Sequence, residues 1–300
     1  MVAGKEPTSK LLLVDGHAYA YRAFHALRSL ASPAGVPTNA LYGFIKALAK
    51  LRAQLRPTHA AVVWDGGLAV ERLALLPAYK AQRPPMPAPL AQQLALITTW
   101  LQAAGLASHC QPGVEADDWI ATLARVAVAA GAEVIIASTD KDFMQLVSPG
   151  IGLLNPNDQD QVIGAAPQVR AKTGVAPEQI VDWLSLVGDR VDNIAGVPGI
   201  GPKTAASLLA QFGSWEGLRA RVGQVPAAKT RAQLQAAEQL VERNRRMIRL
   251  NGQLPCAVTL AELACRPADQ ARLRELYGSW GFQSLLRELE REPARQAELF

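Results

Sequence analysis

The sequence predicts an α/β fold with a mostly parallel central sheet flanked by helices. Three short apolar runs each end in an aspartate: Lys10–Asp15, His59–Asp65 and Glu133–Asp140. Continuous apolar runs are typical of buried parallel strands, and helical patterns separate these runs along the chain. Open α/β sheets bind ligands at the carboxyl ends of their strands. The three aspartates are therefore expected to meet at one edge of the sheet.

The length fits one large α/β domain, or one core with a smaller helical appendage. The chain has 300 residues, 49% of them apolar, and a net charge of +5. No run approaches the ~18 apolar residues of a membrane span, and residues 1–10 lack the apolar core of a signal peptide, so a cytoplasmic protein without a membrane partner is expected. Three cysteines without CxxC spacing favour reduced thiols over a zinc site.

The elements between and after these strands follow from periodicity. Helices are expected at residues 19–30, 39–54, 90–104, from 115 onward, at 177–187 and at 268–289, and short strands at 151–154, 161–163 and 255–263. Beyond Phe212 the chain is helical in pattern and rich in arginine. The basic stretch 243–249 suits either a phosphate backbone or a solvated helix.

Residues 66–89 have a different composition. They contain Arg72, Tyr79, Lys80 and Arg83 before a proline cluster, with few core residues. A long excursion of this kind is either a functional arch over the strand ends or a proline-stiffened surface loop.

The stretch 184–209 combines two chemical features. Asp189 and Asp192 are three residues apart, so their carboxylates can face one cavity. A glycine-rich hairpin follows and opens an apolar helix, whose N-terminus favours an anion. The hairpin residues are Gly199, Ile200, Gly201, Pro202, Lys203 and Thr204. This combination indicates an enzyme that acts on nucleic acid.

Nine acids are expected to converge near the strand ends. They are Asp15, Asp65, Glu115, Asp117, Asp118, Asp140, Asp142, Asp189 and Asp192. Acids in the first turn of a helix, as at 115–118, can simply complement its dipole, but three of them exceed that need. Carboxylates without a nearby histidine or cysteine select Mg²⁺, or Mn²⁺ in its place, over zinc. Two such ions ~3.5–4 Å apart can activate water and stabilise the leaving oxygen of a phosphodiester.

The motifs resemble those of one family. They are LLLVDGHAYAYRAFHAL at 11–27, HAAVVWD at 59–65, YKAQRPPMP at 79–87, GVEADDWIATLA at 113–124, STDKDFMQLV at 138–147, GDRVDNIAGVPGIGPKTA at 188–205 and GFQSLLREL at 281–289. In this order they resemble the 5′-nuclease domains of bacterial DNA polymerase I, within the flap endonuclease family with its PIN-like fold. Because no polymerase domain follows Phe300, a free-standing form or an excised domain is expected.

The resemblance implies a role for each part. The nine acids would line two metal sites, the first mainly from Asp15, Asp65, Glu115 and Asp117, the second from Asp140, Asp142, Asp189 and Asp192, with Asp118 serving either. Lys80 and Arg83 would hold the scissile phosphate, with Tyr79 and Arg22 beside them. The hairpin 199–204 would grip duplex DNA, and family members often hold K⁺ there on main-chain carbonyls. Here those carbonyls would be Leu186, Val187, Ala195, Val197 and Ile200.

The expected organisation has three parts. Residues 1–176 form the catalytic domain with the arch at 66–89, residues 177–290 form a helical DNA-binding subdomain with a helix-hairpin-helix-like motif at 184–212, and residues 291–300 form a tail. The last five residues, Gln296–Phe300, look like the QxxLF peptides that dock on sliding clamps, although a frayed terminus is the simpler interpretation. A monomer is expected.

The predicted function is a Mg²⁺-dependent 5′ to 3′ exonuclease and 5′-flap endonuclease of DNA replication and repair. One alternative is a branched-DNA-binding protein that does not cut, which the complete acid set argues against. Others are a flap endonuclease-like protein with endonuclease activity only, and an RNA-cleaving PIN-type toxin, which fits neither the hairpin nor the length.

Overall fold

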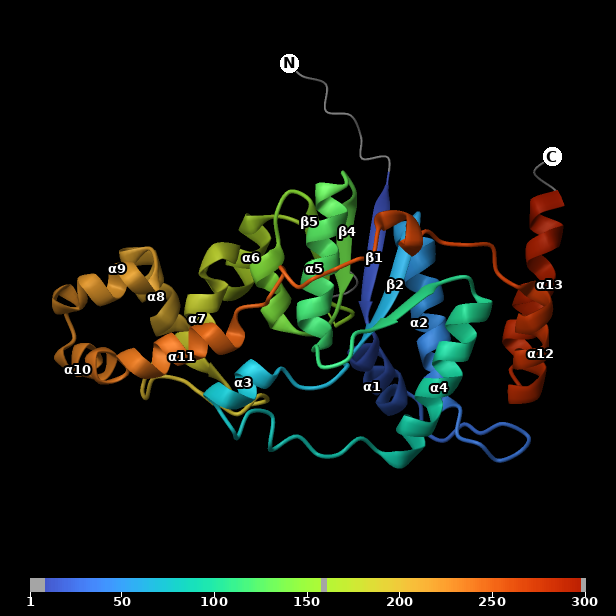
Figure 1. The fold of residues 1–300 in the computed structure, drawn as a ribbon, viewed down its shortest axis with the longest axis horizontal. Coiled ribbons are helices and arrows are strands. Elements are labelled where there is room, and N and C mark those ends of the chain that lie inside the picture. The colour runs from blue at the N-terminus through green and yellow to red at the C-terminus, as the bar shows by residue number, and fades with distance from the viewer. Residues whose placement is uncertain (1–8, 158–160, 298–300) are drawn as a thin grey trace, which may run out of the picture.

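A six-stranded sheet organises the protein, and a computed structural model describes residues 9–157 and 161–297 of it (Figure 1). The strand order is β3-β2-β1-β4-β5-β6, and every neighbouring pair is parallel except β5 and β6. The strands are β1 (Lys10–Asp15), β2 (His59–Trp64), β3 (Ala107–Cys110), β4 (Glu133–Ala137), β5 (Ile151–Leu154) and β6 (Val162–Ile163). The predicted fold class, a mostly parallel sheet flanked by helices, is confirmed.

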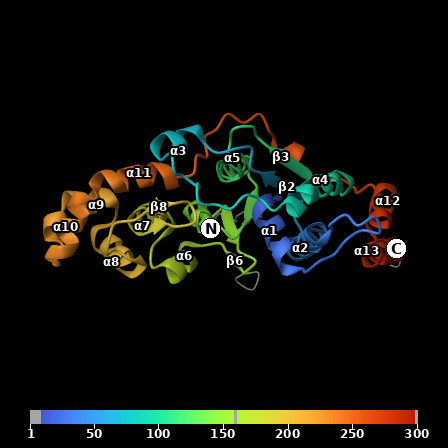
Figure 2. The ribbon, with the colours of Figure 1, turned by 90° about the horizontal axis from the view of Figure 1, so that it is seen from below.

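Helices cover both faces of this sheet and extend the molecule at both ends (Figures 1 and 2). The first group is α1 (Gly16–Ala26), α2 (Asn39–Leu55), α3 (Val70–Leu75), α4 (Ala88–Ala103), α5 (Ala116–Ala129) and α6 (Ala166–Thr173). The second is α7 (Ile180–Val187), α8 (Pro202–Phe212), α9 (Trp215–Ala220), α10 (Ala228–Ala236), α11 (Glu238–Ile248), α12 (Gln270–Trp280) and α13 (Gln283–Ala297). Short 3₁₀ turns are η1 (Lys141–Leu146), η2 (Pro177–Gln179), η3 (Val222–Gln224) and η4 (Leu260–Leu263).

The sheet separates two hydrophobic cores. Along β1, Leu11 and Leu13 pack into one core with α5 and the helices of residues 177–250, while Leu12 and Val14 pack into the other. That second core contains α1, α2, α4, α12 and α13. Alternate residues of a strand point to opposite faces, so a strand that is apolar throughout can be buried on both sides.

Helices α7 to α11 form a unit at one end of the sheet (Figure 2). A two-stranded hairpin, β7 (Gly188–Asp189) and β8 (Ile194–Ala195), joins α7 to the segment that enters α8. Gly188 has φ +82°, and a Cβ there would lie 2.3 Å from the nitrogen of Gly196. The hairpin therefore needs glycine at this position.

The C-terminal helices leave that unit and return to the α/β part. Glu288 of α13 pairs with Lys46 of α2 at 2.9 Å, and the Trp100 indole of α4 donates to the Tyr277 hydroxyl of α12 at 2.9 Å. Helices α12 and α13 thus pack into the second core, against the sheet layer, whereas the sequence analysis placed residues up to 290 in the helical subdomain. The chain pattern alone does not reveal which core a late helix joins.

Several local expectations were wrong. Residues 66–89 contain the helix α3, and both Arg72 and Tyr79 are buried, so this segment is not a loop without core residues. Residues 255–263 form no strand and end in η4; the next residue, Ala264, makes an isolated bridge to His59. The first helix spans 16–26 rather than 19–30, because Asp15 caps it directly after β1.

The tail and membrane expectations are tested only in part. Helix α13 includes Gln296 and Ala297, and residues 298–300 of the predicted clamp-binding tail fall outside the described residues. Within residues 9–157 and 161–297, no helix combines the length and apolarity that a bilayer crossing requires.

Candidate active site

Three strand ends bring acids to the lower edge of the sheet in Figure 1. Val14 pairs with Ala137 of β4, and Asp15 pairs with Val63 of β2, so the three strands end almost level. Asp65 and Asp140 follow β2 and β4 and therefore emerge beside Asp15. The sequence pattern of strand, acid and turn predicted this edge.

Asp15 is the most constrained of these acids. Its carboxylate accepts hydrogen bonds from the Ala18 amide at 3.0 Å and the Ser138 hydroxyl at 2.8 Å. Burial raises the pKa of Asp15 to about 6, although both hydrogen bonds oppose the shift, and Asp65 and Asp140 raise it further. A carboxylate held in this way has a high free energy unless a cation joins it.

The two aspartates in the first turn of α5 lie in different environments. Burial, and then the charges of Asp140 and Asp15, raise the pKa of Asp117 well above its usual value. Asp118 instead accepts hydrogen bonds from Arg72 and from the Asn251 amide. The Asp65 carboxylate accepts from the Ala116 amide at 2.9 Å, which fixes the helix start against the β2 edge.

The remaining acids come from η1 and from the β7–β8 hairpin. Burial raises the pKa of both Asp140 and Asp142, and Asp189 and Asp192 add repulsion to each. The Asp142 amide donates to the Asp140 carboxylate at 2.9 Å, while Oδ1 of Asp142 is buried with no hydrogen-bond partner. Buried polar atoms are rarely left unpaired, so this oxygen points to a missing partner.

Basic side chains from the segment between α3 and α4 lie against these acids. Lys80 Nζ is 2.6 Å from Glu115 and 4.0 Å from Asp192, and Arg83 Nη2 is 2.5 Å from Asp192. Burial disfavours the charged form of Lys80, but Glu115, Tyr79 and Asp192 outweigh it and raise the pKa of Lys80. Lys80 is therefore a permanent cation beside the acids.

Tyr79 and the turn at Asn193 join this segment to the hairpin. The Tyr79 hydroxyl donates to Glu115 at 3.3 Å, and the Lys80 amide donates to the Asp192 carbonyl at 3.1 Å. The Asn193 side chain donates to the Ala78 carbonyl at 2.8 Å. Lys80 and Asn193 both have positive φ, of 55° and 59°, a conformation that costs an ordinary residue roughly 1–2 kcal/mol. These contacts hold the strained backbone in place.

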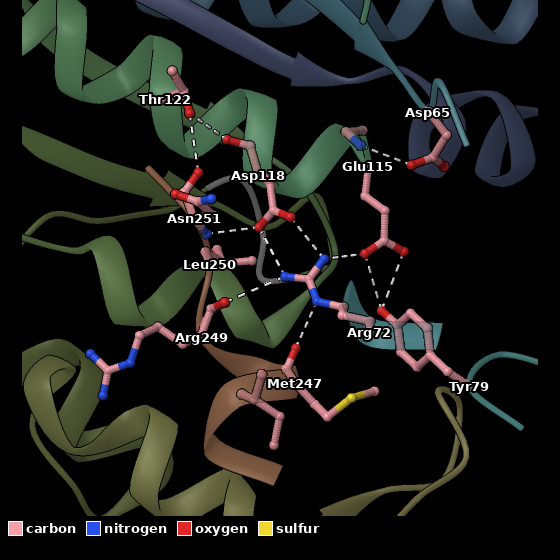
Figure 3. A network of polar contacts seen from close by, with 12 residues as sticks. Asp65, Arg72, Tyr79, Glu115, Asp118, Thr122, Met247, Arg249, Leu250 and Asn251 are labelled. Carbon is pink, nitrogen blue, oxygen red and sulfur yellow. Dashed lines mark hydrogen bonds and ion pairs between the residues drawn. The ribbon is translucent and has the colours of Figure 1, made fainter. Parts of the chain in front are cut away.

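A buried arginine completes the site, and sequence reasoning missed its role. Figure 3 shows Arg72 between Glu115 and Asp118, with its guanidinium also directed at carbonyls from the end of α11. Its side chain is 8% exposed. An arginine in a proline-rich segment gave no sign of burial. The available signal was the three-residue spacing of Glu115 and Asp118, which lets one cation reach both.

The donor set fits hard divalent cations. Seven carboxylates interact electrostatically (Asp15, Asp65, Asp117, Asp140, Asp142, Asp189 and Asp192). Among the residues the structure describes, no three acid, histidine or cysteine side chains stand close enough to hold an ion as they are placed. Lys80, Arg83 and Lys141 instead pair with acids; Lys141 Nζ lies 3.0 Å from Asp189. Crowded carboxylates with raised pKa values and an unpaired buried oxygen suit Mg²⁺ or Mn²⁺ ligation.

The other predicted site residues belong to α1, which follows Asp15, and to the segment that runs from the end of α7 through the β7–β8 hairpin into α8. Gly199 to Thr204 lead into α8, whose exposed first turn contains no acid. Among the predicted potassium ligands, the carbonyls of Leu186, Ala195 and Val197 already accept hydrogen bonds from Val197, Asn244 and Ile200 respectively. Each carbonyl has a second lone pair. Arg22 donates to Asn157 and to the Pro156 carbonyl, on the α1 side of the cavity.

The fold and the chain together define a nuclease class. Residues 10–174 match the family described as "5′-3′ exonuclease, N-terminal resolvase-like domain", and residues 175–271 match "5′-3′ exonuclease, C-terminal SAM fold". A 5′-3′ exonuclease of Aquifex aeolicus is 35% identical over 97% of this chain and 99% of its own length. The chain belongs to the 5′-3′ exonuclease family.

Other relatives are longer proteins. DNA polymerase I of Bacillus caldotenax is 36% identical over 96% of this chain, and that of Pseudomonas aeruginosa is 40% identical over 96%. The chain spans about a third of the length of these polymerases, 33% and 32% respectively.

Solved structures share the fold. A bacteriophage T5 flap endonuclease in complex with DNA and metal ions has a TM-score of 0.66 at 22% identity, covering 96% of this chain and 99% of its own. The catalytic core of Rad2 with a DNA substrate has a TM-score of 0.63 at 17% identity, covering 94% and 92%. At these identities the likeness supports the architecture.

Proposed function

We propose that this protein is a Mg²⁺-dependent 5′ to 3′ exonuclease and 5′-flap endonuclease that hydrolyses DNA with two metal ions. The proposal rests on one observation: seven carboxylates interact near the ends of the strands, and two cations, Lys80 and Arg83, lie against the acids of this site. In metal-assisted phosphodiester hydrolysis, divalent ions activate water and positive charge stabilises the phosphate in the transition state. The flap endonuclease and 5′-3′ exonuclease relatives support the choice of DNA 5′ ends as the substrate.

These seven carboxylates, together with Glu115, would hold the ions in two groups. Asp15, Asp65, Glu115 and Asp117 come from the sheet and α5, whereas Asp140, Asp142, Asp189 and Asp192 come from η1 and the hairpin. When bound, the ions would supply an activated water and neutralise charge on the phosphate. Asp118 is paired with Arg72 and can reach an ion only by leaving that arginine.

Lys80 and Arg83 would move from carboxylates to phosphate. In the structure they neutralise Glu115 and Asp192. Divalent ions would take over that neutralisation, which leaves the lysine and arginine to bind the scissile phosphate and the charge that develops on it. Because the pKa of Lys80 is raised, its charge persists across the physiological pH range.

The helical unit would position the duplex. Lys203 and Thr204 in the first turn of α8 are exposed, so their amides and the Lys203 side chain suit a phosphate of the DNA backbone. One short segment, from Asp189 to Thr204, carries both hairpin acids and this phosphate site. The chain therefore sets how far the duplex lies from the acids. A K⁺ ion on the carbonyls beneath this turn, a cytoplasmic monomer and clamp binding through Gln296–Phe300 belong to the same proposal.

A gel assay tests the function. Labelled 5′-flap, nicked and blunt duplexes are incubated with and without Mg²⁺, using wild type and the double variant Asp140→Asn with Asp142→Asn. We expect the wild type to release 5′ products only when Mg²⁺ is present and the variant to release none. Both proteins should still bind the flap in Ca²⁺. Cleavage that persists in EDTA or in the variant would refute the mechanism. Flap binding without cleavage in Mg²⁺ or Mn²⁺ would identify a non-catalytic branched-DNA binder.

A further inference from the structure

Arg72 joins three parts of the fold through a complete set of hydrogen bonds. It belongs to α3, at the base of the arch segment, and an arginine has five N–H donors in a rigid fork. Nη1 donates to Glu115 and to Asp118 (2.8 Å), and Nη2 donates to Asp118 (2.9 Å) and to the Arg249 carbonyl (3.4 Å). Nε donates to the Met247 carbonyl at 2.8 Å. All five donors are therefore used.

Two of these acceptors are at the C-terminus of α11. Met247 lies in its last turn, and Arg249 is the residue that caps it. The last carbonyls of a helix lack partners within the helix and carry partial negative charge. Arg72 thus donates hydrogen bonds to the C-terminal carbonyls of α11 while it also pairs with Glu115 and Asp118 at the start of α5 (Figure 3).

Helix α11 continues this connection to the β7–β8 hairpin. Asn244, one turn before Met247, is fully buried. Its side-chain amide donates to the Ser185 carbonyl at 3.0 Å and to the Ala195 carbonyl at 2.8 Å. Ser185 belongs to α7 and Ala195 to β8, on the two sides of the hairpin that carries Asp189. The hairpin is therefore attached to the same helix that Arg72 caps.

We propose that Arg72 is a positioning residue that sets the separation between the two groups of metal-binding carboxylates. It fixes Glu115 directly, and it fixes the hairpin acids through α11 and Asn244. The inference rests on the proposed metal-dependent function. Through Arg72, the base of the arch would position the metal-binding carboxylates, a role distinct from contact with the flap.

Electrostatics and positioning predict opposite effects of removing this cation. If Arg72 served only as a counter-charge to Glu115 and Asp118, its loss would make the cavity more negative and tighten divalent-metal binding. If it positions the acids, its loss weakens binding. Substitution of residues that orient metal ligands typically weakens metal affinity about 10- to 100-fold.

The test measures Mn²⁺ binding by electron paramagnetic resonance on the DNA-free protein. The variants are Arg72→Met and Arg72→Lys, the second of which keeps the charge but lacks the five-donor fork. Arg245→Met is the matched control. Like Arg72, Arg245 is a largely buried arginine with several carboxylate partners, among them Asp182 at 2.8 Å. It lies in α11 and pairs with none of the proposed metal-binding acids. We expect the dissociation constants to rise about 10- to 100-fold in both Arg72 variants and to stay unchanged in the control. Unchanged or tighter binding, or full recovery in Arg72→Lys, overturns the proposal.

A metal-free measurement separates this inference from the function itself. Hydrogen exchange is followed in EDTA at the Asn251 amide, which donates to Asp118, and at the Val197 amide, which donates to the Leu186 carbonyl behind the hairpin. Faster exchange at both sites in Arg72→Lys, with circular dichroism reporting a folded protein, supports the positioning role. Faster exchange at Asn251 alone overturns it. Wild type that binds no Mn²⁺ and cuts no flap refutes the proposed function, and the exchange result still decides the connection through α11.

Discussion

Replacing Asp15 with asparagine should stabilise the metal-free protein at neutral pH. The folded carboxyl binds its proton more tightly than the unfolded one, since its pKa rises from 3.8 to about 6. The stability linked to that proton is fully present below pH 3.8 and is lost as the pH rises through 6. At about 1.4 kcal/mol per pKa unit, the ionised Asp15 costs the fold about 3 kcal/mol at pH 8.

Asparagine removes the charge and keeps most of the contacts. It remains a good N-cap, so the bond from the Ala18 amide is retained. We expect Asp15→Asn to raise the free energy of unfolding at pH 8 by about 3 kcal/mol, or roughly 5 °C in Tm for a chain of this size. The difference from wild type should grow between about pH 4 and 6 and level off above about pH 7.

Thermal and urea unfolding in EDTA between pH 5 and 8 measure the effect. Asp269→Asn is the matched control, because Asp269 caps α12 in the same way but is exposed and far from the acids; it should change stability by less than about 0.5 kcal/mol. Adding Mg²⁺ should stabilise wild type more than Asp15→Asn, since the variant has lost a ligand. A variant no more stable than wild type at pH 8, or a gap that does not narrow toward pH 5, would show that the carboxylate is not strained.

Further predictions concern three other positions. Lys80→Met should slow single-turnover flap cleavage about 10²- to 10³-fold, while Lys46→Met, which removes an exposed lysine paired with Glu288, should leave the rate unchanged. Gly188→Ala should destabilise the protein by clearly more than Gly35→Ala in urea unfolding, because both have positive φ but only Gly188 also faces a close backbone contact; equal losses would refute the clash. Asn244→Leu should cost about 2–4 kcal/mol in the same assay, since it removes the side-chain donor from the buried Ser185 carbonyl and from the part-buried Ala195 carbonyl, and a near-neutral result would mean that water replaces the amide.

The sequence predicted best where local pattern and final environment agree. The apolar runs of β1, β2 and β4 are buried on both faces, so their composition identifies them and their terminal acids together. By contrast, β3 is a four-residue edge strand with no fully buried residue, and Ser108 and His109 interrupt any apolar pattern. The stretch at 255–263 contains β-forming residues, but the structure places η4 there, and the next residue, Ala264, makes a single isolated bridge to His59 of β2.

The acids and the arginine illustrate the same limit at the site. Motif spacing predicted nine converging carboxylates, and strand topology explains why seven of them interact. It could not show that Asp118 turns to Arg72 while Asp117 turns to the cavity, because that choice depends on a cation supplied by a distant segment. The burial of Arg72 depends on the carbonyls of Met247 and Arg249, which follow it in the chain by 175 and 177 residues.

The return of α12 and α13 to the sheet has a consequence for biosynthesis. The core that contains α5 and the helical unit is supplied by residues up to Leu263, so that side of the sheet can close before α12 and α13 are synthesised. The opposite core also needs Leu273, Trp280 and Leu289, which are synthesised after all of those residues. The nascent protein therefore holds α1, α2 and α4 over an incomplete apolar surface until α12 and α13 emerge, and this is the side on which a stalled or truncated chain would aggregate.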